Sequence, residues 1–148
     1  MSGGTLHRAW AADLTPTQLY AMLALRAEVF VVEQDSPYQD LDGRDLDPTT
    51  RHFWVSSDDG PAAYLRLVEL PDGALRIGRV CVAKRARGTG LARRLIEAAL
   101  ADVGDGECVL HAQAHLIGMY RAFGFSVDGE QYVEDGIAHV PMRRPAKI

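Results

Sequence analysis

The sequence predicts an α/β fold in which helices cover both faces of a mixed central sheet. Apolar runs of strand length alternate with amphipathic helical segments along most of the chain. In the middle of the chain, a strand, a glycine turn and a long helix lead into another apolar strand. This order predicts a parallel crossover within the sheet. Short turns between the preceding strands predict antiparallel neighbours beside it.

The first half of the chain is expected to hold one strand, one helix and three further strands. The first strand covers residues 6–10. The helix starts after Thr15, because Thr15, Pro16 and Gln18 form a capping-box pattern, and apolar residues then recur with helical period as far as Phe30. The later strands are expected at residues 52–56, 62–70 and 75–82.

The second half is expected to hold two helices and three strands. Leu91, Leu95 and Ala99 fall on one stripe of the longer helix, which ends at Gly104. A strand is expected at residues 108–113, a short helix at 116–123, and final strands at 125–127 and 137–142. Because 148 residues can form one full hydrophobic core, residues 1–148 are expected to be a single domain.

Composition excludes several classes of function. The chain is 47% hydrophobic and 24% charged, as soluble globular proteins are, and its net charge of −4 argues against nucleic-acid binding. No apolar run reaches the roughly 20 residues that span a bilayer, and no signal-peptide core is present, so no membrane association and a cytoplasmic location are expected. Cys81 and Cys108 lie in apolar strands and are expected to be buried free thiols.

The most informative segment, residues 84–94, joins the strand at 75–82 to the long helix. It combines two glycines with the basic residues Lys84, Arg85, Arg87, Arg93 and Arg94. Glycines let the backbone approach a phosphate, and the first N–H groups of a helix have no partners and lie at the positive end of its dipole. The segment lacks the endings of a Walker A loop and of a dinucleotide fingerprint. A different phosphorylated ligand is therefore expected.

The spacing Arg85-x-x-Gly88-x-Gly90 resembles the loop with which the GNAT acetyltransferase superfamily holds the pyrophosphate of acetyl-CoA. The resemblance implies a GNAT acyl-CoA N-acyltransferase fold and acetyl-CoA as cosubstrate. It also implies that the preceding strand pairs with the pantetheine amides as a sheet edge pairs with an added strand. The cofactor-binding residues implied are Val80, Cys81, Val82, Arg85, Arg87, Gly88, Thr89, Gly90, Leu91, Ala92 and Gln113.

The segment from Gln113 to Phe125 resembles a second GNAT motif, Asn-x-x-Ala-x-x-x-Tyr-x-x-x-Gly-Phe. Tyr120, Gly124 and Phe125 match this motif. Gln113 stands in place of the asparagine, and Leu116 stands in place of the alanine. By this resemblance Tyr120 is the catalytic acid that protonates the departing thiolate.

Further runs resemble the ElaA-like branch of the superfamily, a bacterial group whose substrates are poorly defined. These are Leu-Arg-Ala-Glu-Val-Phe-Val-Val-Glu-Gln at residues 25–34 and Glu-Asp-Gly-Ile-Ala-His-Val-Pro-Met at residues 134–142. Together the matching runs cover nearly the whole chain. The resemblance defines fold and cofactor better than it defines the acceptor.

The general base is expected to depart from the common family pattern. Many members carry a glutamate on a strand beside the cofactor, where this chain offers Arg79 and His111. Glu33, at the end of the first long helix, is the preferred catalytic base, and Glu69 and His111 are alternatives. An amine that is already neutral when it binds needs no dedicated base.

The acceptor is expected to bind between the acidic loop at residues 33–51 and a late segment of the chain. The candidate substrate-binding residues are Asp42, Asp45, His52, Glu134 and His139. The excess of carboxylates favours a cationic acceptor such as a polyamine, a lysine or a protein N-terminus. No metal is expected, because His111 and His115 share no helical register.

The sequence therefore predicts an acetyl-CoA-dependent N-acetyltransferase that transfers acetyl directly to a primary amine of a small molecule, peptide or protein. Direct transfer is favoured because neither cysteine has an activating neighbour in view. The alternative is a non-catalytic, acyl-CoA-binding regulatory module. The sequence leaves open whether the protein forms a homodimer.

Overall fold

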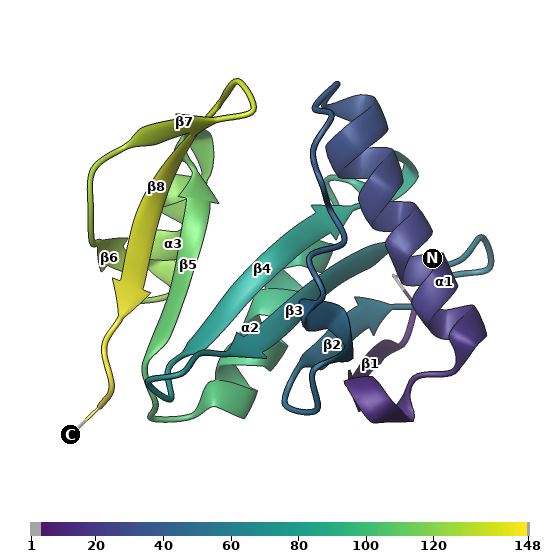
Figure 1. The fold of residues 1–148 in the computed structure, drawn as a ribbon, viewed down its shortest axis with the longest axis horizontal. Coiled ribbons are helices and arrows are strands. Elements are labelled where there is room, and N and C mark those ends of the chain that lie inside the picture. The colour runs from purple at the N-terminus through teal and green to yellow at the C-terminus, as the bar shows by residue number, and fades with distance from the viewer. Residues whose placement is uncertain (1–3, 148) are drawn as a thin grey trace.

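One mixed sheet runs through the protein and carries helices on both faces (Figure 1), which confirms the predicted α/β fold. The computed structural model describes residues 4–147, so residues 1–3 and 148 of the predicted domain lie outside the described residues. The strands are β1 (Leu6–Trp10), β2 (Arg51–Val55), β3 (Ala63–Glu69), β4 (Leu75–Val82), β5 (Cys108–Gln113), β6 (Ser126–Val127), β7 (Tyr132–Glu134) and β8 (Ile137–Arg144). They lie in the order β1-β2-β3-β4-β5-β8-β6, with β7 paired to β8, and only β4 and β5 run parallel within this described part.

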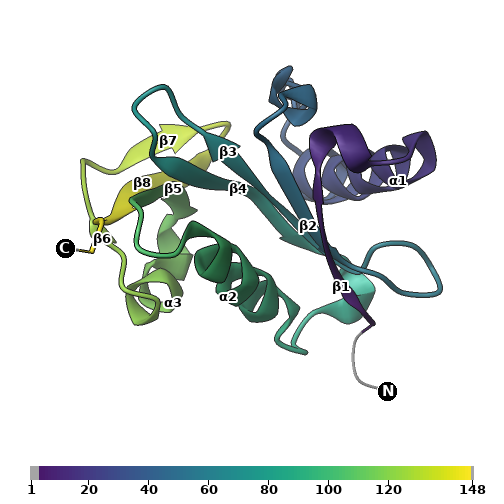
Figure 2. The same cartoon turned by 90° about the horizontal axis from the view of Figure 1, so that it is seen from below.

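Within the part of the chain that the structure describes, three α-helices cover the sheet. They are α1 (Pro16–Arg26), α2 (Leu91–Val103) and α3 (Ile117–Ala122). Helix α1 lies on one face, and α2 and α3 lie on the other (Figure 2). Within residues 4–147, no helix has both the length and the apolar composition that crossing a membrane requires.

Two hydrophobic clusters join these layers. The larger cluster lies between the sheet and the α2–α3 layer, and its members include Phe53, Leu65, Leu67, Leu95 and Ile96. The smaller cluster lies under α1, and its members include Met22, Leu25, Val29, Trp54 and Tyr64. Burying one such side chain stabilises the fold by about 1.5–3 kcal/mol. The strands β2 to β4 are thus packed on both faces.

The first helix starts as predicted and ends differently. Thr15 and Gln18 form the capping box, with N–H···O distances of 3.1 and 3.0 Å between them. Beyond α1 the chain continues as a π-helical turn, Ala27–Glu33, in which the N–H of Gln34 donates to the carbonyl of Val29. The helical period of the sequence does not distinguish this wider turn from an α-helix. Such turns are frequent at functional sites, and this one ends at Glu33.

A β-bulge interrupts β4. Arg79 and Val80 on β4 together face the single residue Leu65 on β3, because the register shifts by one residue there. Arg79 has φ of 56°, in the left-handed region that residues other than glycine rarely adopt. A bulge of this kind bends its strand and re-aims the backbone groups next to it.

Strands β4 and β5 separate soon after they meet. Their parallel pairing is limited to Leu75 with Cys108 and Arg76 with Val109. Beyond these pairs, the edge of residues 77–82 that faces β5 has no strand partner in the described structure. Figure 1 shows the two strands diverging toward the top of the view. The sheet therefore opens on one side of β4.

The polar segment between the π-helical turn and β2, residues 34–50, forms a strap across the face that α1 covers. Arg26, fully buried, donates to Asp40 at 3.0 Å and to Asp45 at 2.6 Å. Arg66 of β3 also donates to Asp45, at 3.0 Å. The acidic residues of the predicted loop are thus partly internal ligands of arginines that hold the strap in place.

One strand was missed by sequence analysis. Strand β7 is a short, exposed partner of β8, connected to it through Asp135 and Gly136, both at positive φ. Asp-Gly is a strong hairpin signal, but three residues are too few for strand periodicity to be recognised. The other strand boundaries differ from the predicted ones by at most two residues.

Replacing Arg26 should strongly destabilise the protein. Arg26→Ala removes the fully buried partner of Asp40 and Asp45 and leaves each with one arginine, Arg79 or Arg66. Breaking a buried pair of this kind costs about 3–5 kcal/mol. The exposed pair of Arg143 and Glu107 offers a matched control, and Arg143→Ala should cost at most about 1 kcal/mol. Urea unfolding measures both free energies. Equal, small losses would show that the strap does not depend on Arg26.

Stability should also fall in mild acid because of His52. This ring is fully buried, with its nitrogens 2.6 Å from the Tyr64 hydroxyl and 2.9 Å from the Asp45 carbonyl. Burial lowers the pKa of His52 below its usual value of 6.5. The unfolded chain then binds a proton that the folded protein excludes, so the free energy of unfolding decreases as the pH drops below about 6.5. Urea unfolding between about pH 8 and 5 should show this loss, and His52→Gln should remove most of it.

Candidate active site

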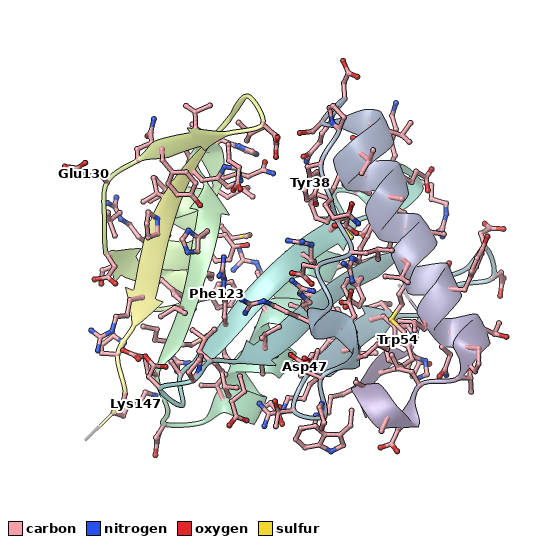
Figure 3. The ribbon with its side chains drawn as sticks, in the orientation of Figure 1. Tyr38, Asp47, Trp54, Phe123, Glu130 and Lys147 are labelled. Atoms are coloured by element: carbon pink, nitrogen blue, oxygen red, sulfur yellow. The ribbon has the colours of Figure 1, made fainter. Side chains whose placement is uncertain are left out.

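A cleft of about 930 Å³ opens where β4 and β5 diverge. One wall consists of β4, the π-helical turn and the strap, and the other consists of β5, α3 and the β7–β8 hairpin. Tyr38 of the strap stands at the mouth of the cleft, between α1 and the β7–β8 side (Figure 3). The cleft therefore lies at the parallel crossover that the sequence predicts.

The β4 wall offers backbone groups for pairing. Val80, Cys81 and Val82 line the cleft on the edge that lacks a strand partner. The carbonyl of Val82 accepts a hydrogen bond from Nε of Arg87 at 3.2 Å. An extended ligand with amide groups can pair with this edge as an additional strand does.

The glycine loop at the start of α2 presents unpaired N–H groups. Gly88 and Gly90 have φ of 78° and 80°, and Gly90 precedes the helix without any side-chain cap. Among residues 4–147, no acceptor receives the backbone N–H groups of residues 88–93, whereas the N–H of Arg87 donates to the carbonyl of Lys84. A Cβ built on either glycine would meet no atom within 4 Å, so the loop is open. Successive free N–H groups at a helix start form an anion site.

The arginines of this segment do not all face the cleft. The guanidinium of Arg85 lies 3.3–3.5 Å from the backbone carbonyls of residues 59–61, in the turn between β2 and β3. Arg93 lies over the ring of Phe123 on the outer side. Arg87 does line the cleft. Positive charge beside the open N–H groups is thus supplied mainly by Arg87.

Glu33 and Arg87 are joined by a two-pronged ion pair. Both carboxylate oxygens of Glu33 accept from the guanidinium of Arg87, one of them at 2.7 Å. The hydrogen bond from Arg87 lowers the pKa of Glu33. A carboxylate held in this way is a weaker base than a free one. Glu33, which the sequence analysis preferred as the catalytic base, thus lies in the cleft. It is paired there with Arg87, which was expected to bind the pyrophosphate.

Tyr120 reaches the cleft from α3. Its ring packs edge-on against Phe125, with a centroid distance of 6.1 Å. Within the described chain its hydroxyl has no hydrogen-bond partner, and burial raises its pKa to about 12. The phenol is therefore protonated at neutral pH and has a proton available for a ligand atom.

His111, Tyr132 and His139 line the opposite wall. His111 of β5 lies with Nδ1 2.7 Å from the hydroxyl of Tyr132, and the Tyr132 ring stacks on His139 at 5.6 Å. Burial lowers the pKa of His111, and the charge of Arg76 lowers it further. When Nδ1–H donates to Tyr132, Nε2 of the neutral ring retains a lone pair for a proton. Gln113 lines the same wall.

The residues predicted to bind the acceptor are split by the structure. Asp42, Glu134 and His139 line the cleft, whereas Asp45 of the strap and His52 of β2 are buried and do not. Asp42 itself accepts from Arg66, and this bond holds the pKa of Asp42 well below its usual range. The strap carboxylates Asp40, Asp42 and Asp45 are paired with arginines, so they direct no excess of negative charge into the cleft.

Sequence reasoning missed three arginines of the cleft and named the fourth, Arg79, only as the residue that stands in place of a strand glutamate. Arg44, Arg66, Arg76 and Arg79 all line it. Polar and apolar residues alternate along β4, and this alternation places Arg76 on the side away from the core. It is the signal in the sequence that could have identified Arg76. Among residues 4–147, no group of three or more His, Cys, Asp or Glu side chains forms a metal site.

Residues 11–145 match the family model of an acetyltransferase (GNAT) domain. The chain therefore belongs to the GNAT acetyltransferase family and has its acyl-CoA N-acyltransferase fold. The family transfers acyl groups from acyl-CoA, and the match makes this protein an acyltransferase of that kind. The resemblance seen in the loop and helix motifs is confirmed.

Similar proteins place the chain near ElaA. A UPF0039 protein of Mycobacterium tuberculosis is 53% identical over 144 residues, which cover 95% of this chain and 92% of that one. Escherichia coli ElaA is 42% identical over 139 residues, covering 90% and 91%, and its crystal structure matches with a TM-score of 0.89 over 95% of this chain and 98% of ElaA. The crystal structure of an acyl-CoA N-acyltransferase from Pseudomonas aeruginosa matches with a TM-score of 0.91 at 44% identity, over 95% and 98%.

Altering a loop glycine should weaken coenzyme A binding. Gly90→Ala forces the backbone away from φ of 80° and turns N–H groups away from the anion site. Losing one charge-assisted hydrogen bond corresponds to about tenfold in affinity or more. Gly73→Ala is the control, since Gly73 has φ of 90° and equally open surroundings in the β3–β4 turn. Calorimetric titration with coenzyme A should separate the two variants, and equal affinities would remove the loop from the binding site.

Proposed function

We propose that the protein is an N-acetyltransferase that moves acetyl from acetyl-CoA directly to a primary amine. One observation carries this proposal: an unpaired strand edge lines the cleft, and an open row of N–H groups adjoins it where Arg87 and Ala92 line the cleft. Diphosphate and pantetheine amides require these two features in this order along an extended ligand. Family membership supports acyl-CoA as the donor.

The residues that would hold the donor follow from this arrangement. The N–H groups of residues 88–92 would bind the diphosphate, and Arg87 would supply charge. The free edge at Val80, Cys81 and Val82 would pair with the pantetheine arm, and Gln113 stands on the facing strand. Arg85 points at the β2–β3 turn and would act on the loop shape more than on the ligand.

Two side chains are suited to the proton transfers. His111 is neutral at pH 7 and can take the proton that the amine loses as it attacks the thioester carbonyl. Tyr120 can give a proton to the sulfur as the carbon–sulfur bond breaks and the carbon–nitrogen bond forms. We assign the base to His111 in preference to Glu33, because Glu33 is engaged by Arg87.

A covalent acetyl-enzyme is disfavoured. The nucleophile of such a route is a thiolate, and Cys81 is the cysteine in the cleft. Burial raises the pKa of Cys81 to about 12, so the thiol stays protonated at neutral pH. The non-catalytic alternative would leave the protonated Tyr120 and the neutral His111 in the cleft without a role.

Thiol release from acetyl-CoA in the presence of an amine panel tests the proposed activity. Tyr120→Phe and His111→Gln should each lower kcat by about 10²–10⁴-fold. Their affinity for coenzyme A should stay unchanged, since neither side chain lies at the glycine loop. The wild-type kcat/KM should also fall in acid as His111 becomes protonated, at a pH below its usual pKa of 6.5, because burial and Arg76 lower that pKa.

The control for this experiment is His7→Gln. His7 stacks on Trp54 and contacts Ser56, away from the cleft, and its loss should leave kcat unchanged. Tight coenzyme A binding without thiol release from any amine would support the regulatory module instead. Full activity of Tyr120→Phe and His111→Gln would show that these two residues are not the catalytic acid and base.

A further inference from the structure

Most charges around the cleft are matched in pairs. Arg26, Arg66 and Arg79 contact the strap residues Asp40, Asp42 and Asp45. Arg87 is paired with Glu33. These guanidinium groups already have carboxylate partners, so they have little free capacity to recognise an acceptor.

Arg76 is an exception. It lines the cleft and is partly buried, yet its side chain has no hydrogen bond and no ion pair with any residue of the range 4–147. Its backbone stands opposite Val68 on β3 and Val109 on β5, at the last pair before β4 and β5 part. Arg76 thus lies at the floor of the cleft, where the two walls meet.

The surroundings of Arg76 add positive charge. Burial lowers the pKa of Arg76, and the charges of Arg44, Arg66 and Arg79 lower it further. Arginine nevertheless stays protonated in proteins. A partly desolvated cation without a counterion is unfavourable unless a ligand neutralises it. Arg44, on the strap, also lines the cleft without an ion pair among the described residues.

The opposite wall has the complementary charge. Glu134, at the end of β7, and Asp135, in the turn to β8, line the cleft, and neither carboxylate has an ion pair within residues 4–147. His111 lies between this turn and Arg76, two residues along β5 from Val109. A strand rises about 3.3 Å per residue, so the backbones of Val109 and His111 are roughly 7 Å apart, and Arg76 lies beside Val109 on the neighbouring strand.

We propose that the acceptor is a small amino acid, whose carboxylate is bound by Arg76 at the floor of the cleft while its amine faces His111. This inference rests on the proposed N-acetyltransferase function and names its substrate class. The planar guanidinium suits a carboxylate, and Arg44 stands near enough to add charge. Glu134 and Asp135 attract the ammonium form, which loses one proton to water, and His111 takes the second proton as the neutral amine attacks. The short span between Arg76 and His111 favours an amine and a carboxylate on one compact molecule over a polyamine or a long cationic chain.

The test compares matched acceptors. Acetyl-CoA is supplied with each common amino acid, with the corresponding amino-acid amide and with the corresponding amine that lacks the carboxyl group, and thiol release is measured. The free amino acid that reacts best should exceed its amide in kcat/KM by roughly ten- to a hundredfold, the value of a charged hydrogen bond. Arg76→Gln should remove this preference by raising KM for the amino acid, with little change in the slower reaction of the plain amine.

Two further variants make the result specific. Arg76→Lys keeps the charge but not the two-pronged geometry, and it should retain part of the preference. Arg143→Gln, on the exposed side of β8, should leave all rates unchanged. Circular dichroism confirms that each variant is folded. Binding of the preferred amino acid to the coenzyme A complex, measured by calorimetry, should weaken in Arg76→Gln by the same factor as kcat/KM.

The outcomes separate this inference from the function on which it rests. Transfer to plain amines and amides as readily as to amino acids, or an unchanged preference in Arg76→Gln, would overturn the assignment of Arg76 and leave the acetyltransferase standing. Absence of thiol release with every acceptor would overturn the acetyltransferase, and the substrate class with it. Calorimetry would still show in that case whether Arg76 binds a carboxylate ligand.

Discussion

The limited pairing of β4 with β5 is the constraint on which the rest of the structure depends. The two strands share two residue pairs, and the bulge at Arg79 then bends β4 away. A sheet opened in this way leaves backbone groups unpaired, and unpaired buried groups are unfavourable unless a ligand or water satisfies them. The same divergence creates the cleft and places the start of α2 at its end. Fold and binding site thus share one cause.

Buried ion pairs keep this opening in shape. Arg26 and Arg66 fix the strap, and Arg79 reaches from the bulge to Asp40 at 2.8 Å. An arginine at positive φ is held there only if its side chain is well anchored, and Asp40 provides that anchor. The network is internally balanced in charge, so recognition in the cleft falls to the groups outside it. For this reason the acidic residues of the strap do not make the cleft acidic.

Local features were predictable from the sequence, and features that depend on distant contacts were not. The limits of β4 and β5, the capping box at Thr15 and the open glycine loop all follow from short-range rules, and the structure agrees with them. The partners of the strap aspartates lie up to 39 residues away in sequence, so composition alone suggested a cationic acceptor. The contact of the Arg85 side chain with the β2–β3 turn and the ion pair between Glu33 and Arg87 likewise depend on tertiary packing.

The central claim is that the free N–H groups of residues 88–93 and the unpaired edge of β4 together hold one extended ligand. A crystal structure of the complex with coenzyme A tests this most directly. We expect the diphosphate oxygens within hydrogen-bond distance of the loop N–H groups, and the pantetheine amides paired with the backbone of Val80 to Val82. A nucleotide bound elsewhere, or a pantetheine arm outside the β4–β5 opening, would contradict it.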